Sequence, residues 1–415
     1  MNINYDINLL KLIVFIDFFA VSIVVPLLSS YFRDAGLDSK SYGLVSSLYF
    51  VSQLFGGLLT GFASDYFRKK DILLISFIGS AFSYFIVGFS KEVPLLLTSR
   101  VIVGLVKQTM TMSTIIISDI TENDKSRRSV ELGQLSAIIT GAFVIGPSIG
   151  GFMYKYDSRL PAITAVALFA VDTIICLLFL PDYHTKSDCK TASTEAPKSK
   201  MSFFRDIRSI LSLPITGSLL LFRLLLIFVE SSMNANNILN YFESKFGIET
   251  YQRGFLSSVV SVTSLIVDAL MVAPVMRLVH HGRGGERIVV YLCILVMALA
   301  AFAEYLIGNF YIYVLLCLLP TVVSSSLLSS ASKAIFLNSV LKPNTGKAIG
   351  VLGLLSSGVG VFTPIYGSQL FGFLDGLRYK GLIAGCHFIA LEICCFVLLR
   401  GLRPIFVDEL PPHEE

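Results

Sequence analysis

Six charged or polar side chains stand inside long apolar runs of the chain, a setting in which such groups are rare: Asp17, Gln53, Arg100, Lys107, Arg223 and Glu230. A charge at the centre of a lipid bilayer costs at least about 2.5–3.5 kcal/mol on insertion scales, so it normally faces a partner or a water-filled cavity. A carboxylate in such a place can bind and release a proton, whereas an ammonium or guanidinium can hold an anionic group. We therefore predict that these six residues bind a small solute, protons or both.

The charged members of this group fall into two sets along the chain. Asp17 and Lys107 lie near the middles of the first and fourth apolar runs, where they could pair with each other or with a bound solute. Arg223 and Glu230 are seven residues apart in one run. Two helical turns would put them on one face, roughly 10.5 Å apart. Each set therefore offers a cation and a carboxylate at membrane depth.

The composition of the chain indicates the class of protein that holds these groups. Of 415 residues, 54% are hydrophobic and only 15% are charged, against about 25% charged residues in an average soluble domain. A soluble protein of this composition would expose too much apolar surface to stay dispersed, which excludes a soluble enzyme, a nucleic-acid-binding protein and a disordered chain. The sequence shows no nucleophile–base pair, nucleotide-binding loop or cysteine pattern for zinc, so we expect no enzymatic activity, metal or cofactor.

Twelve apolar segments are long enough to cross a membrane as helices, because a span needs roughly 20 residues. They lie near residues 8–31, 40–64, 71–89, 94–118, 130–153, 160–180, 209–233, 251–274, 287–307, 310–332, 346–371 and 381–400. The predicted fold class is an all-α membrane protein with twelve transmembrane helices in two groups of six. We predict an N-terminal six-helix bundle (1–181), a linker (182–208) and a C-terminal six-helix bundle (209–415).

The Lys and Arg residues of the loops predict the orientation of the chain. If the N-terminus faces the cytoplasm, the inner loops and tails hold about twice as many Lys and Arg residues as the outer loops, which is the usual bias of membrane proteins. We therefore expect a multi-pass membrane protein with both termini in the cytoplasm. The polar linker 182–208 would then be a flexible cytoplasmic tether.

Four motifs occur at particular places in the first half of the chain. Asp17 and Pro26 stand in the first span; Gly61, Asp65, Arg68, Lys69 and Lys70 follow the second; Arg100 and Gly104 stand in the fourth; Gly141, Gly146, Pro147, Gly150 and Gly151 stand in the fifth. In this order they resemble the motifs of the major facilitator superfamily of transporters, and in particular its tetracycline and drug:proton antiporter branch. The first and fourth spans are also similar to those of the group of major facilitator superfamily domain-containing protein 9.

The resemblance implies a gate at the inner ends of the helices. In this family the carboxylate that Asp65 matches meets the N-terminal end of the eleventh helix, where free N–H groups favour an anion. Arg68, Lys69 and Asp119 would complete a charge cluster that closes the inner side and breaks when the transporter opens inward. Alternatively, the basic residues only set the topology. Tyr66 and Arg68 stand where the family usually has Arg and Gly, so the geometry of this gate is expected to differ.

The resemblance also divides the remaining residues between packing and scaffold. Gly141, Gly146, Gly150 and Gly151 would let another helix approach closely, and Pro147 would bend the fifth span. The resemblance places this face against the eighth helix. Spans six, nine and twelve are usually outer scaffold in the family, and Lys333 can extend to the cytoplasm. We therefore expect structural roles for Asp172, Glu304, Lys333 and Glu392.

The function implied by the resemblance is secondary active transport of a small organic solute by alternating access, with protons as the coupling ion and antiport favoured. Asp17 or Glu230 would bind the proton, and Lys107 would pair with that carboxylate or hold an anionic group of the solute. The expected partners are the solute, protons and the lipid bilayer, with no nucleic acid, and the expected state is a monomer. Two alternatives stay open: an uncoupled facilitator, and a transporter-like receptor or adaptor that does not transport.

Overall fold

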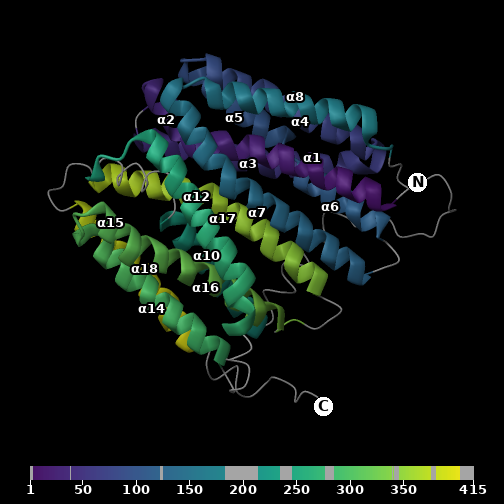
Figure 1. Cartoon of the computed structure of the whole chain (residues 1–415). Coiled ribbons are helices and arrows are strands. Elements are labelled where there is room, and N and C mark those ends of the chain that lie inside the picture. Colours follow the sequence, from purple (N-terminus) through teal and green to yellow (C-terminus); the bar gives the residue numbers. More distant parts are fainter. Residues whose placement is uncertain are drawn as a thin grey trace, which may run out of the picture. The chain divides into compact units, whose positions relative to one another are not determined.

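The computed structural model of the chain describes residues 3–37, 39–121, 125–182, 214–233, 245–275, 285–338, 340, 345–374 and 380–401. The regular elements of these ranges are all helices (Figure 1). Eleven helices in the described part are long and apolar enough to cross a membrane. Together with these eleven, α10 (Pro214–Met233) makes twelve, and it matches the predicted span near 209–233. The predicted linker lies outside the described residues, except for Asp182.

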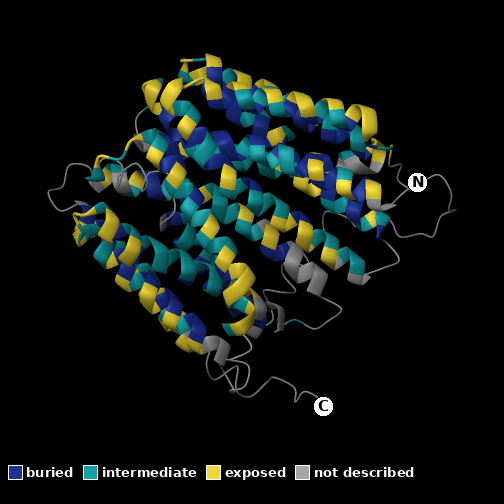
Figure 2. Ribbon diagram, in the orientation of Figure 1, coloured by how far each residue is buried: buried dark blue, intermediate teal, exposed yellow. Residues whose placement is uncertain are grey.

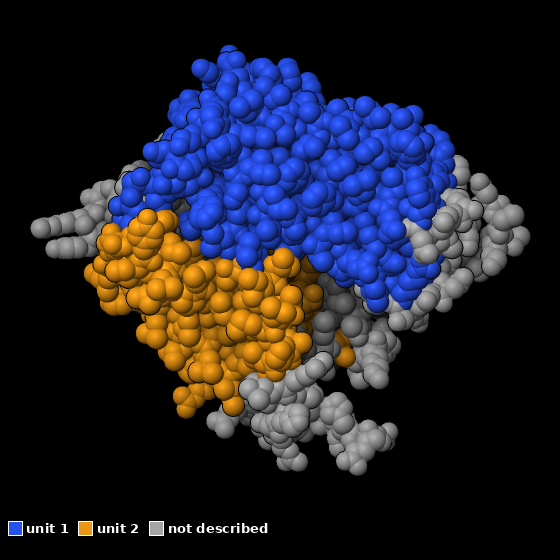
Figure 3. All heavy atoms as spheres, viewed as in Figure 1, with its two compact units in different colours: residues 1–192, 242–262 blue, residues 193–241, 263–415 orange. Residues whose placement is uncertain are grey.

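The chain divides into two compact units (Figure 3). Unit 1 comprises residues 1–192 together with 242–262, and unit 2 comprises residues 193–241 together with 263–415. Unit 1 therefore includes most of α12 (Thr250–Ile266), which belongs to the eighth predicted span. The division into six-helix bundles at 1–181 and 209–415 stays a prediction.

Unit 1 is built from the helices of the first six predicted spans. These are α1 (Ile3–Val24), α2 (Leu28–Asp34), α3 (Ser39–Tyr66), α4 (Lys69–Phe89), α5 (Val93–Val106), α6 (Thr109–Ile120), α7 (Lys125–Tyr156) and α8 (Leu160–Phe179). The helix α1 packs along both α7 and α8, α4 packs along α8 and α5, and α3 packs along α5. This arrangement brings α1, α4, α5 and α8 together around a common core.

Two of these spans are interrupted. Pro26 lies in a short 3-10 turn (Val25–Leu27) that separates α1 from α2, as expected of a residue without a backbone N–H. The fourth span breaks between Val106 and Thr109, where Lys107 (ψ 82°) and Gln108 (φ −123°) leave the helical conformation. The span predicted near 94–118 is present as Val93–Ile120, and the break divides it into α5 and α6.

Unit 2 contains the remaining spans apart from most of α12. Its helices are α10, α14 (Gly285–Leu306), α15 (Phe310–Tyr313), α16 (Leu319–Asn338), α17 (Thr345–Leu374) and α18 (Lys380–Gly401). The helix α14 packs against α16 and α18, and α10 packs against α17. Two π-helical turns, η3 (Val267–Met271) and η4 (Val314–Leu318), widen the helices that precede α14 and α16. This packing places polar residues of α10 next to α16.

Large apolar side chains cover much of the surface of both units. On α14, Ile288, Leu292, Leu295 and Leu299 are all exposed, and their spacing of three and four residues forms one stripe along the helix. Exposed residues also run along α8, where Ile174, Leu177 and Leu178 point outward (Figure 2). Such stripes are costly in water but suit contact with lipid chains.

Candidate functional site

Asp17 and Lys107 form a buried ion pair in unit 1. The Nζ atom of Lys107 donates to Oδ1 of Asp17 at 2.5 Å. Asp17 is 0% exposed and Lys107 is 9% exposed, so the pair is closed to solvent. Of the two arrangements that the sequence left open, the structure has the two residues paired with each other.

The break in the fourth span places Lys107 opposite Asp17. The backbone N–H of Lys107 still donates to the carbonyl oxygen of Val103 at 2.9 Å, as the last bond of α5. The next N–H, that of Gln108, donates instead to the hydroxyl oxygen of Ser76 on α4 at 3.3 Å. The Ser76 hydroxyl also lies 3.2 Å from that of Thr109, the first residue of α6. Ser76 therefore satisfies a donor that a continuous helix would satisfy internally.

Aromatic rings surround the Lys107 ammonium. Its Nζ atom lies 4.7 Å from the centre of the Phe169 ring on α8 and 5.8 Å from that of Phe18 on α1. Cations are attracted to the faces of such rings, and more strongly where water is excluded. The two rings therefore add cation–π attraction to the ion pair between Lys107 and Asp17.

Arg100 adds a second buried cation to this core. Its Cζ atom lies 5.5 Å from the centre of the Tyr84 ring, which stacks on Phe169 with the ring centres 5.5 Å apart. The Arg100 guanidinium also donates to the hydroxyls of Ser83 at 3.4 Å and Ser99 at 3.3 Å. Arg100 and Lys107 thus each lie near one ring of the same stacked pair.

Gln53 lies beside the helix break rather than against the ion pair. Its side-chain NH₂ donates to the Tyr49 hydroxyl at 3.2 Å, and its backbone carbonyl accepts from the side chain of Gln108 at 3.4 Å. A close approach of α3 to α5 makes these contacts possible, because a Cβ atom added at Gly104 would lie 2.6 Å from the Cβ of Ser52. Gln53 therefore helps to hold the broken segment in place.

Asp172 on α8 joins the same core, although we expected only a structural role for it. It is 0% exposed, and neither of its carboxyl oxygens has a hydrogen-bond partner among the described residues. The charges of Asp17 and Lys107 both act on it. Its sequence signal is a single acid in a strongly apolar span, three residues after Phe169.

The polar residues of unit 2 have different partners. The Arg223 guanidinium donates to the hydroxyls of Ser332 at 2.6 Å and Ser329 at 2.9 Å, both on α16. Oε1 of Glu230 is buried and lacks a hydrogen-bond partner among the described residues. The structure records no hydrogen bond between Arg223 and Glu230 in this described helix, although the charge of Arg223 acts on Glu230.

Two acids that we expected to be structural differ in their surroundings. Oε1 of Glu304 accepts a hydrogen bond from the Tyr313 hydroxyl at 3.3 Å, which ties the end of α14 to α15. Glu392 on α18 is 1% exposed, and both its carboxyl oxygens lack a hydrogen-bond partner among the described residues. The charge of Glu230 acts on Glu392. Glu304 thus has a clear structural contact, whereas the carboxyl oxygens of Glu392 have none among the described residues.

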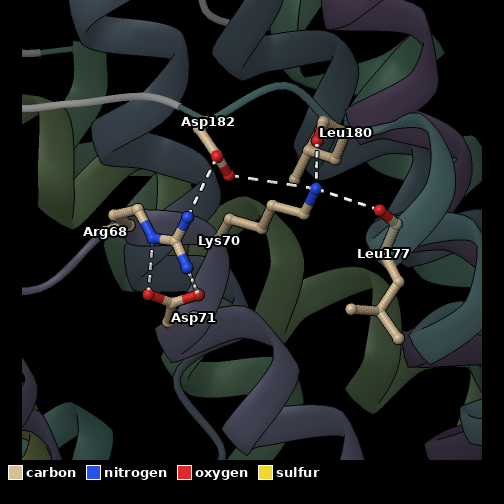
Figure 4. Close-up of polar contacts among 6 residues, drawn as sticks. All are labelled: Arg68, Lys70, Asp71, Leu177, Leu180 and Asp182. Atoms are coloured by element: carbon tan, nitrogen blue, oxygen red, sulfur yellow. Dashed lines mark hydrogen bonds and ion pairs between the residues drawn. The ribbon is translucent and has the colours of Figure 1, made fainter.

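The predicted gate residues lie where α4 begins. Lys69, whose side chain is buried, forms an ion pair with Asp119 near the end of α6. Arg68 donates to both carboxyl oxygens of Asp71, at 2.8 and 3.1 Å, and to Asp182 at 3.0 Å (Figure 4). Hydrogen bonding to Asp71 and the charge of Asp182 raise the pKa of the Arg68 guanidinium. The side chain of Asp65 lies outside the described part, so its role stays a prediction.

Lys70, the second residue of α4, binds the end of α8. Its Nζ atom donates to the backbone carbonyl oxygens of Leu177 at 3.0 Å and Leu180 at 2.7 Å (Figure 4). These carbonyls lie at the end of α8, where the last turn of a helix lacks internal donors and carries partial negative charge. The basic residues at the start of α4 therefore bind α6 and α8.

The glycine motif of α7 packs against two other helices of unit 1. A Cβ atom added at Gly146 would lie 1.8 Å from the Ser22 hydroxyl oxygen, and one added at Gly150 would lie 2.0 Å from the Ile23 carbonyl oxygen, both on α1. On the other side, a Cβ atom at Gly151 would lie 2.6 Å from the carbonyl oxygen of Tyr251 on α12. Only glycine fits at these three positions without movement of a neighbour.

The other two residues of this motif, Pro147 and Gly141, differ in how closely a neighbouring helix approaches them. Pro147 stands inside α7, and its carbonyl oxygen would lie 2.2 Å from a Cβ atom added at Gly254 of α12. A Cβ atom added at Gly141 would meet nothing within 4 Å among the described residues. The prediction of close packing at Gly141 is therefore corrected, because no neighbouring helix in the described part approaches that position.

The sequence that carries these residues matches a known protein family. The model of the Major Facilitator Superfamily matches residues 10–364. The chain belongs to this family. It is therefore an integral, multi-pass membrane protein and a transporter rather than an enzyme. Members of the superfamily act on small molecules in a lipid membrane.

Curated relatives within the superfamily include drug-resistance proteins. The chain is 24% identical to Multidrug resistance protein 2 of Bacillus subtilis over 391 residues, which cover 94% of this chain and 91% of that protein. It is 31% identical to Quinolone resistance protein NorA of Staphylococcus aureus over 180 residues, which cover 43% of this chain and 46% of that protein. The predicted resemblance to the superfamily and its drug-transporting members is thus confirmed.

Solved structures of superfamily transporters have the same fold. The nucleoside transporter NupG matches with a TM-score of 0.74 and 18% identity, over 96% of this chain and 100% of that one. The D-xylose-proton symporter matches with a TM-score of 0.65 and 18% identity, over 94% and 96%. These matches confirm the predicted all-α fold of twelve membrane-spanning helices.

Proposed function

We propose that the protein is a proton-coupled transporter of a small organic solute, with antiport favoured, and that the Asp17–Lys107 pair is its coupling element. One observation carries the proposal: a carboxylate and an ammonium, both buried, lie 2.5 Å apart at a break in a membrane-spanning helix. Broken helices are typical of ion and substrate sites in secondary transporters, because they free polar groups at membrane depth.

The coupling follows from the charge balance of the pair. While Asp17 is ionised, it neutralises Lys107, and the closed core is stable. A proton on Asp17 removes one of the two charges and leaves a buried cation whose desolvation is no longer compensated. A conformation in which Lys107 contacts water or an anionic group is then favoured. Proton binding and conformational change are thereby linked.

The comparisons support the class of solute. The relatives are named for resistance to multiple drugs and to quinolones, and one solved structure of the same fold is a proton symporter. We propose that Arg100, Gln53, Arg223 and Glu230 contribute to binding the solute or the proton. We also propose that Lys69, Asp119, Arg68 and Asp65 form an inner gate, that the transporter is a monomer, and that both termini face the cytoplasm.

The test is transport in proteoliposomes with an imposed pH gradient. The probe is norfloxacin, a fluorescent quinolone, and an entrapped pH dye reports proton movement. We expect the wild type to accumulate norfloxacin against its gradient, and Asp17→Asn to abolish accumulation. Glu304→Gln is the matched control, because this acid has a structural contact in unit 2. If Asp17→Asn and Glu230→Gln both retain proton-driven flux, the coupling assignment is wrong.

Two further outcomes would favour the alternatives. If norfloxacin moves down its gradient at a rate that does not depend on pH, the protein is an uncoupled facilitator. If no compound in a broad thermal-shift screen raises the melting temperature of the purified protein, a receptor or adaptor role is favoured. The several charges buried in unit 1 argue against that role, since a scaffold has little reason to retain them.

A further inference from the structure

Asp172 is a second buried carboxyl group in unit 1, on α8 and three residues after the Phe169 ring that contacts Lys107. It is 0% exposed, and its two oxygens lack a hydrogen-bond partner among the described residues. Buried polar groups are almost always hydrogen-bonded. An acid left in this state inside a packed helical core therefore needs an explanation in terms of its charge.

The surroundings of Asp172 place it at the ion pair. Its helix, α8, packs along α1, which holds Asp17, and along α4. Phe169 precedes Asp172 by three residues, so the two share one face of α8. The ring of Phe169 lies 4.7 Å from Lys107 Nζ. Asp172 therefore lies on the face of α8 whose ring contacts the ammonium.

Four other residues belong to the surroundings of Asp172, and two of them are charged. Asp17 from α1 and Lys107 from the break between α5 and α6 are the charged residues that act on it. Cys176, one turn further along α8, is affected by the charge of Asp172. From α4, Tyr84 reaches this region through its stacking on Phe169. The cluster thus holds one ammonium and two carboxyl groups.

The charge balance of this cluster requires a proton. Arg100, the second buried cation of this core, donates to Ser99 and Ser83 and is not among the charged residues that act on Asp172. With both acids ionised, the cluster of Lys107, Asp17 and Asp172 would therefore carry a net negative charge in a core where Asp17 and Asp172 are each 0% exposed. An uncompensated charge in such a place is strongly destabilising. One proton on either carboxyl group makes the cluster neutral. Two acids that interact closely in this way titrate as a pair rather than separately.

We propose that Asp17 and Asp172 share one coupling proton, with the Lys107 ammonium as their common partner. This inference rests on the proposed function of the Asp17–Lys107 pair. In the state described here, Asp17 is ionised and paired with Lys107, and Asp172 carries the proton. In the second state, the O–H bond on Asp172 has broken, one on Asp17 has formed, and Lys107 has moved to Asp172. Lys107 remains an ammonium throughout.

The first test is a thermal-unfolding cycle on the purified full-length protein. In Asp17→Asn or Asp172→Asn alone, Lys107 keeps one carboxylate, so we expect a moderate loss of stability. The double variant leaves Lys107 without a counter-charge, so its melting temperature should fall by far more than the sum of the two single effects. Adding Lys107→Met to the double variant should restore stability. Additive single effects, without rescue by Lys107→Met, would overturn the proposal.

The second test detects the proton itself. Infrared spectroscopy of the purified protein at neutral pH should show a protonated-carboxyl C=O band that is lost in Asp172→Asn and retained in Glu304→Gln. An ionised Asp172 would contribute nothing to this band, so its substitution by asparagine would leave the band unchanged. An unchanged band in Asp172→Asn contradicts the proposal.

The third test separates this inference from the proposed function. In proteoliposomes, Asp172→Asn should lose gradient-driven accumulation of norfloxacin, since the shared proton is gone, whereas Glu304→Gln should keep it. If the wild type shows no proton-driven accumulation, the proposed function fails, and the unfolding cycle and the infrared band still decide the proton assignment. If the wild type accumulates norfloxacin and Asp172→Asn does so equally well, the shared-proton inference alone fails.

Discussion

Ser76 on α4 accepts a hydrogen bond from the backbone N–H of Gln108 at 3.3 Å, and so one helix stabilises a break in its neighbour. Inside a membrane, a backbone donor without a partner costs several kcal/mol, because lipid offers no acceptor. The Ser76 hydroxyl therefore stabilises the break between the consecutive helices α5 and α6. Since Lys107 lies in this break, the geometry of the Asp17–Lys107 pair depends on Ser76.

Replacement of Ser76 by alanine tests this dependence. The change should destabilise the protein by about 1–3 kcal/mol, since it leaves the Gln108 donor without its partner. Ser80→Ala is the matched control, because Ser80 is also buried on α4 but its hydroxyl has no hydrogen-bond partner among the described residues. Thermal unfolding in detergent measures both variants. Equal losses in the two would show that the Ser76 contact does not support the break.

Phe169→Leu tests the contribution of the aromatic ring to the Lys107 charge. The ring should contribute about 0.5–2 kcal/mol beyond its packing, as a buried cation–π contact. Phe77→Leu is the control for packing alone, since Phe77 is also fully buried in unit 1. We expect Phe169→Leu to be more destabilising than Phe77→Leu, and the difference to disappear in a Lys107→Met background. A difference that persists there would mean that packing, not charge, is responsible.

The surroundings of the glycines on α7 and α12 predict that alanine destabilises the protein at some of these positions and not at others. Gly150→Ala and Gly254→Ala should each destabilise the protein by about 1–3 kcal/mol or more, since the added methyl group would press on the backbone of α1 or α7. Gly141→Ala should be neutral or stabilising by up to about 1 kcal/mol, because alanine favours helix and meets no described neighbour there. The melting temperatures of the three variants, compared with that of the wild type at matched expression, test these expectations. A costly Gly141→Ala would contradict the structure.

Arg223→Lys should weaken the junction between α10 and α16. The guanidinium reaches Ser332 and Ser329 at the same time, whereas the single ammonium of lysine lacks this planar fork. We expect a loss of about 1–2 kcal/mol in thermal unfolding, the size of one or two hydrogen bonds. Arg400→Lys, at the exposed end of α18, is the control and should have no measurable effect. Equal behaviour of the two variants would exclude the paired hydrogen bonds as a stabilising feature.

The sequence predicted the spans and the buried charges well, because both depend on composition. An apolar run of about 20 residues identifies a helix across a membrane wherever it packs, and a charge inside it signals a partner. Asp17 and Lys107 were found in this way. Their pairing was one of two arrangements that the sequence allowed, and only the contact of α1 with the broken fourth span decides between them.

Other features depend on contacts that the sequence does not show. The break at Lys107 and Gln108 has neither proline nor glycine at its centre, and its cause lies on another helix, at Ser76. Asp172 stands in a span that is apolar on every side, so periodicity does not reveal which face meets α1. Gly141 and Gly150 belong to one motif, yet only the neighbouring backbone distinguishes an open position from a tight one.

The break in the fourth span also affects how this segment is compared with relatives. A helical wheel drawn from Val93 keeps its phase only as far as Val106, because the next two residues leave the helical conformation. From Thr109 onward the wheel needs a new origin. Labelling or cysteine-accessibility profiles across residues 93–120 should therefore show two separate periodic series with a phase shift between them, and alignments that assume one unbroken helix would assign residues of α6 to the wrong face.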